Sequence, residues 1–114
     1  MKIAIPIAQG QLCTHFGHCE NFYFFDVDPD TKNIMNKEVL TAPPHEPGLL
    51  PRLLSEKGVN LVIAGGMGGR AQQLFQQNGV KVVTGASPAG GSPEEIIKSY
   101  LTGVLQTGAN PCDH

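Results

Sequence analysis

The chain has 114 residues and a formal net charge of −2, from ten acidic and eight basic side chains. This length predicts one domain with a real hydrophobic core, and the lack of a basic excess excludes nucleic acid as the main partner. There is no apolar stretch of about 18 residues and no signal-peptide core, so we expect a cytoplasmic protein without a membrane partner. We expect a monomer or a weak homo-oligomer whose three cysteines are free or metal-bound.

The N-terminal half of the chain has the pattern of three strands. Isoleucines alternate with other residues over 3–7, an aromatic run covers 22–27, and a third strand is predicted around 34–40. Asp, Pro and Asn residues in the segment 28–33 predict a hairpin loop between the last two strands. These strands give the sheet an antiparallel part, and a Pro-rich connection over 42–48 joins it to the rest of the chain.

The C-terminal half alternates helices with buried strands. Leucines at helical spacing follow the Pro-rich connection and predict a helix that ends at Gly58. Short apolar runs predict strands over 61–64 and 80–84. A helix over 70–78, stopped by Gly79, is expected between these two strands.

The last helix has the clearest sequence signals. Ser92 is a favourable N-cap, Pro93 suits the first helical position, and Glu95 completes a capping box. The apolar stripe of this helix comprises Ile96, Ile97, Tyr100, Leu101, Val104 and Leu105. The resulting order, β-β-β-α-β-α-β-α, predicts an α/β fold with a mixed five-stranded sheet and helices on its faces. Residues 1–106 are expected to form one domain, and residues 107–114 a flexible tail.

Cysteine and histidine residues are strongly clustered. Six of the seven lie in two short segments, 13–19 and 112–114, which together comprise ten positions. Four of them form the pattern C-x-H-x-x-H-C in the first segment, and two lie in the second. The first group comprises Cys13, His15, His18 and Cys19, and the second comprises Cys112 and His114. Thiolates and imidazoles at short spacing converge on soft or borderline metals, which favours a metal site in the 13–19 loop. In the structural alternative, Cys19 packs as a small hydrophobe and the histidines cap loop backbone groups.

A glycine-rich turn between a strand and a helix is the second candidate site. It consists of Gly65, Gly66, Met67, Gly68, Gly69 and Arg70. Glycines let backbone N–H groups approach a ligand, and the following helix N-terminus favours an anion, although no Walker A or dinucleotide fingerprint is present. Close packing of the helix on the strand is the alternative explanation. Met67 either supplies a thioether to a soft metal or fills a gap in the core.

His45 stands alone in the Pro-rich connection, beside Glu46. Its default role is at the entry to the following helix, and a ligand role requires its loop to share one sheet edge with the other two candidate loops. Catalytic patterns are scarce. The serines lack a nucleophile-elbow context, and the spacing of Cys13 and His15 is a poor predictor of a thiolate–imidazolium pair. We therefore expect a protein that is not an enzyme.

Three segments resemble the dinitrogenase iron–molybdenum cofactor biosynthesis family, which includes NifX-like carriers and the C-terminal domain of NifB. Residues 14–22 are similar to its H-F-G-x-x-x-x-F signature, residues 45–51 to its helix entry, and residues 62–68 to its glycine turn. The resemblance runs in the right order from Lys2 to Leu105. It implies a ribonuclease H-like fold and a non-catalytic carrier or scaffold for a metal–sulfur cluster, in cofactor assembly related to nitrogen fixation.

The resemblance also implies the contents of the site. The implied metal ligands are His15, Cys13, Cys19, His18, His45 and Met67, with Cys112 and His114 as weaker ones. The implied cargo is an iron–sulfur, iron–molybdenum–sulfur or molybdenum–copper–sulfur cluster, passed between donor and acceptor proteins. The backbone of Gly65, Gly66, Gly68 and Gly69, with Arg70, is expected to bind its anionic part.

Two other functions stay open at this point. One is a structural or regulatory zinc-binding module, in which the ion ties down the 13–19 loop. The other is a small α/β protein that binds a phosphate ligand with the Gly65–Arg70 turn. A loss of thermal stability on chelation, in a protein without a chromophore, would identify the first. An increase in the stability of the protein on addition of a nucleotide, absent in Arg70→Ala, would identify the second.

Overall fold

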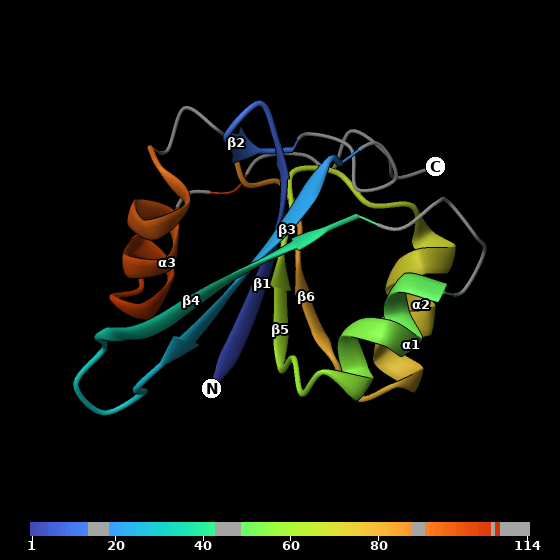
Figure 1. The fold of residues 1–114 in the computed structure, drawn as a ribbon, viewed down its shortest axis with the longest axis horizontal. Coiled ribbons are helices and arrows are strands. Elements are labelled where there is room, and N and C mark those ends of the chain that lie inside the picture. Colours follow the sequence, from blue (N-terminus) through green and yellow to red (C-terminus); the bar gives the residue numbers. More distant parts are fainter. Residues whose placement is uncertain (14–18, 43–48, 88–90, 106, 108–114) are drawn as a thin grey trace.

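The computed structural model describes residues 1–13, 19–42, 49–87, 91–105 and 107. Within these residues the chain forms one mixed sheet of six strands and three helices (Figure 1). The strands are β1 (Lys2–Ala8), β2 (Gln11–Leu12), β3 (Asn21–Val27), β4 (Ile34–Thr41), β5 (Leu61–Ile63) and β6 (Lys81–Val83). The helices are α1 (Leu49–Glu56), α2 (Gly69–Gln77) and α3 (Pro93–Leu101).

The sheet has an antiparallel part and a parallel part. Its strand order is β4-β3-β1-β5-β6, and β2 pairs with β1 beside this path. Strand β3 runs antiparallel to both β1 and β4, whereas β1, β5 and β6 are parallel to one another. Parallel neighbours need a crossover, which α2 supplies between β5 and β6. The mixed α/β architecture therefore agrees with the sequence prediction.

Strand β2 is absent from the sequence prediction, which gives five strands. It pairs with the end of β1 through a two-residue turn, in which Gln9 has φ 53° and Gly10 has φ 77°. Two consecutive positive φ values are the signature of a type I′ hairpin turn. Asn-Gly is the usual sequence for this turn, and Gln-Gly is not. A strand of two residues also shows no alternation that a sequence pattern can reveal.

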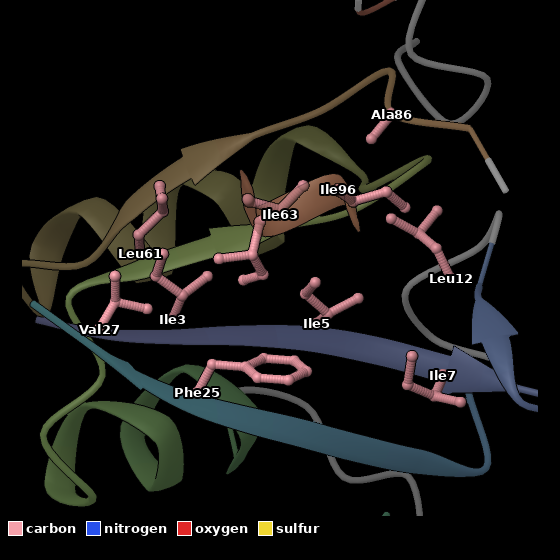
Figure 2. Packing of buried hydrophobic residues seen from close by; sticks show 11 residues of the cluster. Ile3, Ile5, Ile7, Leu12, Phe25, Val27, Leu61, Ile63, Ala86 and Ile96 are labelled. Carbon is pink, nitrogen blue, oxygen red and sulfur yellow. The ribbon is translucent and has the colours of Figure 1, made fainter. Parts of the chain in front are cut away.

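Each face of the sheet has its own hydrophobic core. Figure 2 shows the first core, where Ile3, Ile5 and Phe25 of the sheet point toward Ile63 of β5 and Ile96 of α3. The second core contains Leu54 of α1, Phe75 of α2 and Met67 of the glycine turn. Helices α1 and α2 thus cover one face and α3 covers the other (Figure 1). Strand β1 is buried on both faces, as expected for a central strand.

All three helices end with a glycine in the left-handed region. These glycines are Gly58, Gly79 and Gly103, with φ values of 83°, 75° and 77°. The first two confirm the predicted ends of α1 and α2. The third ends α3 earlier than the sequence stripe predicts.

The prediction is wrong for Val104, which is 66% exposed. The N–H of Gly103 donates to Tyr100 O at 3.1 Å, and the N–H of Val104 donates to Ser99 O at 2.9 Å. This pair of bonds is the Schellman motif, which turns the chain away from the helix axis. Leu105 still packs against the first core.

The start of α3 confirms its predicted signals. Ser92 Oγ accepts from the N–H of Glu95, and Glu95 Oε1 accepts from the N–H of Ser92, both at 3.2 Å. Pro93 occupies the first turn, and Glu94 adds a second carboxylate beside the positive end of the helix dipole. In the described part of the chain, no helix has the length and apolar character needed to cross a bilayer.

Candidate functional site

Four strands end at the same edge of the sheet. Strands β1, β5 and β6 are parallel, and β4 runs in their direction because β3 is antiparallel to both β1 and β4. The chain therefore leaves this edge after Ala8, Thr41, Ile63 and Val83. Ligand sites in open α/β sheets lie beyond the carboxyl ends of the strands. The described residues next to these strand ends, among them Cys13, Cys19, Ala42 and Ala64, therefore lie at one edge of the sheet.

Pro6 opens the sheet at this edge. Strand β3 pairs with one side of β1, so β2 and β5 share the other side. The register of β1 with β5 covers Ile3 and Ala4, and the register with β2 covers Ile7 and Ala8. Proline has no N–H to give to a ladder, so on this side Pro6 takes part only through its carbonyl, and neither register includes it. The sequence analysis did not identify Pro6 as a site residue, although a proline inside a strand is a recognisable signal.

Cys13 and Cys19 lie at this edge on either side of β1. The N–H of Cys13 donates to Pro6 O at 2.8 Å, and the N–H of Glu20, next to Cys19, donates to Ile7 O at 2.8 Å. Carbonyls of consecutive strand residues point to opposite sides of the strand. The chain segments that carry the two thiols therefore flank β1. Cys13 is buried and Cys19 is partly buried.

The two thiols interact electrostatically. Burial, and to a smaller extent the nearby Cys13, raise the pKa of Cys19 from its usual 9.0 to about 11. A backbone hydrogen bond lowers the pKa by a smaller amount. Both residues are thiols rather than members of a disulfide. A cation at this position would reverse the balance, because it favours the thiolate that burial disfavours.

Met67 lies in the second core together with Cys19. Its side chain is completely buried, and Cys19 packs against the same cluster. The Met67 carbonyl accepts a hydrogen bond from Gln72 Nε2 at 2.9 Å, which fixes the glycine turn to the first turn of α2. Gln72 is a further residue that the sequence analysis missed, because a glutamine on a helix carries no pattern of its own. Cys19 thus interacts with Cys13 and packs against the core cluster that contains Met67.

The glycine turn continues the sheet and then begins α2. The N–H of Gly85 donates to Gly65 O at 2.7 Å, which keeps the chains after β5 and β6 side by side. Gly65 and Gly66 are buried, whereas Gly68, Gly69 and Arg70 are exposed. Gly68 is the N-cap of α2 and gives the helix no side-chain hydrogen bond.

Gly68 and Gly69 are not glycines that the fold requires. Gly68 has φ −62°, which any residue adopts, and an added Cβ at either position would meet nothing within 4 Å. The first turn of α2 also has no acidic residue. Among the described residues, α2 therefore has neither a side-chain cap nor an acidic residue in its first turn to balance its positive end, in contrast to α3. The alternative explanation, close packing of helix on strand, does not apply to these two glycines.

Five candidate ligands lie outside the described residues: His15, His18, His45, Cys112 and His114. Among the residues that are described, no three His, Cys, Asp or Glu side chains form a group that could hold a metal ion. The described donors are two thiols and one thioether, which are soft ligands. This donor set fits a thiophilic metal or a metal–sulfur cluster and does not fit a hard cation such as Mg²⁺.

Comparison with known proteins places the chain among relatives of the same size. The family described as "Dinitrogenase iron-molybdenum cofactor" matches residues 1–103. Protein MJ0580 of Methanocaldococcus jannaschii is 34% identical over 111 residues, which cover 93% of this chain and 90% of that protein. The crystal structure of PH0822 shares 32% identity with a TM-score of 0.84, over 94% of both chains.

A third likeness concerns the fold alone. The apo form of the orange protein from Desulfovibrio gigas is 22% identical, with a TM-score of 0.67 over 96% of this chain and 94% of that one. The match to the family covers nearly the whole chain and includes the 13–19 loop, the segment after β4 and the glycine turn. The chain therefore belongs to the dinitrogenase iron–molybdenum cofactor family.

Proposed function

We propose that this protein is a non-catalytic carrier or scaffold that binds a metal–sulfur cluster for metallocofactor assembly or transfer. The observation that carries the proposal is the arrangement of Cys13, Cys19 and the buried Met67 at one sheet edge, beside the open start of α2. Thiolates are the ligands that iron–sulfur and related clusters take from proteins. Membership of the family supports a cargo of the iron–molybdenum cofactor type.

The protonation of Cys19 suits a carrier that must also release its cargo. With a pKa of about 11 the thiol holds its proton in the empty site, and binding of a metal displaces that proton. Because the metal must compete with this proton, the affinity of the site for the metal is lower at neutral pH. Moderate affinity is what transfer to an acceptor protein requires.

The start of α2 supports binding of an anionic cargo. Metal–sulfur clusters with thiolate ligands carry net negative charge, and the first N–H groups of a helix favour such a charge. Gly68 and Gly69 leave that end accessible, and the guanidinium of Arg70 is exposed beside it. The same features suit a phosphate, but a phosphate site would have no use for the sulfur donors.

The complete site in this proposal is larger than its described part. His15, His18 and His45 complete the ligand set, with contributions from Cys112 and His114 in the tail over 107–114. Cluster donor and acceptor proteins are the partners. The domain over 1–106 is assigned to the ribonuclease H-like folds, and the setting is the cytoplasm.

The test is anaerobic reconstitution of the purified protein with ferrous iron and sulfide. The wild type is expected to gain visible absorption and acid-labile sulfide, and the double variant Cys13→Ala/Cys19→Ala is expected to lose both. Leu12 and Glu20, which flank these residues, stay unchanged. Circular dichroism of the double variant, compared with that of the wild type, checks that the domain is still folded. Equal uptake of iron and sulfide by the double variant would show that these thiols do not form the site. A colourless protein with stoichiometric zinc would identify the zinc module instead.

A further inference from the structure

Glu20 joins three segments of the chain at the edge that carries the thiols. Its Oε1 accepts a hydrogen bond from the N–H of Gln9 at 2.7 Å. Its own N–H donates to Ile7 O at 2.8 Å, and its carbonyl accepts from the N–H of Ala42 at 3.0 Å. These bonds connect the β1–β2 turn, the end of β1, the start of β3 and the end of β4.

The bond to Gln9 holds a strained turn in place. Gln9 has φ 53°, in the left-handed region that disfavours a residue with a Cβ. Such a conformation persists only where the surrounding structure fixes it. The Glu20 carboxylate supplies a charge-assisted acceptor for the N–H of Gln9, which is among the stronger kinds of hydrogen bond.

The geometry also fixes one thiol relative to the other. Cys13 follows β2 and is held to β1 through Pro6, and Cys19 directly precedes Glu20. Loss of the carboxylate removes the direct bond between the β1–β2 turn and the start of β3. The two thiol-bearing segments are then held relative to each other only through their backbone bonds to β1. A cargo that contacts both thiols must reach over the end of β1, so it is sensitive to movement of one segment relative to the other.

We infer that Glu20 is a positioning residue, which sets the distance between the Cys13 and Cys19 segments through its bond to Gln9. This inference rests on the proposed function. The carboxylate acts on the N–H of Gln9 through its Oε1 acceptor and not directly on the cargo, because a negative charge does not attract an anionic cargo. Glu20→Gln keeps a carbonyl oxygen at this position, whereas Glu20→Ala removes it.

The experiment measures how fast iron leaves the reconstituted protein to an excess chelator, together with the visible circular dichroism of the cluster. Glu20→Ala is expected to lose iron roughly tenfold faster and to change the dichroism, the size of effect typical of a lost charge-assisted bond. Glu20→Gln keeps a neutral acceptor and is expected to release iron more slowly than Glu20→Ala. Asp28→Ala is the matched control, because Asp28 Oδ1 accepts the N–H of Asp30 at 2.9 Å at the opposite end of the sheet.

The outcomes separate the inference from the function on which it rests. A wild type that assembles no cluster overturns both. A wild type that assembles one, with Glu20→Ala releasing iron no faster than Asp28→Ala, overturns the positioning role and leaves the carrier function standing. Faster release by Glu20→Gln and Glu20→Ala alike would show that the charge matters, and would also overturn the inference.

Discussion

At the scale of single residues, Cys19 is a thiol whose surroundings oppose its ionisation. Partial burial is the largest cause of its raised pKa, and Cys13 adds to it. The folded chain therefore holds this proton more tightly than the unfolded chain does. The contribution of this proton to the free energy of unfolding is fully present below pH 9.0 and is lost as the pH rises toward 11.

The raised pKa of about 11 predicts the reactivity of Cys19 toward iodoacetamide. Only the thiolate reacts, so the rate is expected to reach half its maximum near pH 11, whereas the rate of an ordinary thiol is half-maximal near pH 9.0. Peptide mass spectrometry resolves Cys19 from the other two cysteines. The same protein in denaturant provides the ordinary profile for comparison. A half-maximal rate near pH 9.0 in the folded protein would contradict this account of its environment.

Met67 offers a test of sulfur at a buried position. Met67→Leu keeps the volume and costs less than about 1.5 kcal/mol of stability. If the thioether contacts the cargo, iron retention is expected to fall roughly fivefold, which corresponds to about 1 kcal/mol. Met35→Leu is the matched control, because Met35 is 72% exposed near the start of β4, away from the site edge. Unchanged retention of iron in Met67→Leu would show that Met67 only packs in the core and does not contact the cargo.

At the scale of elements, α2 and α3 begin in opposite ways. Ser92 and Glu95 satisfy the start of α3 within the chain, whereas Gly68 leaves the start of α2 without a side-chain partner. The first N–H groups of α2 are thus left to water or to a ligand. The difference gives the two helices different expected responses to substitution.

Paired variants at the two helix starts separate stability from binding. Ser92→Ala is expected to cost about 1 kcal/mol without changing cluster retention. Gly69→Ala is expected to gain up to about 1 kcal/mol, because the position is helical and an added Cβ meets nothing. The same methyl group is expected to weaken retention by crowding the cargo. Urea unfolding and chelator release measure the two quantities, and unchanged retention in Gly69→Ala would contradict the proposed use of the turn.

The sequence predicts elements well where the signal lies within a few residues. The capping box of α3 and the glycine stops at Gly58 and Gly79 are local, and the structure has all of them. Strand β2 and the end of α3 are not predicted. In β2 the turn needs a strained Gln9, and in α3 the apolar residues continue beyond the point where Gly103 turns the chain.

At the scale of the whole molecule, strand direction decides which loops meet. Sequence clustering identifies the 13–19 loop and the glycine turn as separate candidates, and no local pattern shows that they share an edge. That fact depends on the pairing of β1 with both β3 and β5. The contributions of Pro6 and Glu20 depend on the same pairing, because each acts through hydrogen bonds between segments distant in sequence.

The most direct measurement is elemental and sulfide analysis of the protein purified without oxygen, before and after reconstitution with ferrous iron and sulfide. The carrier proposal predicts visible absorption, with iron and acid-labile sulfide bound in stoichiometric amounts that disappear in Cys13→Ala/Cys19→Ala. Binding that is full in this double variant would contradict the proposed site. A protein that stays colourless and free of iron and sulfide after reconstitution would contradict the cluster-binding function itself.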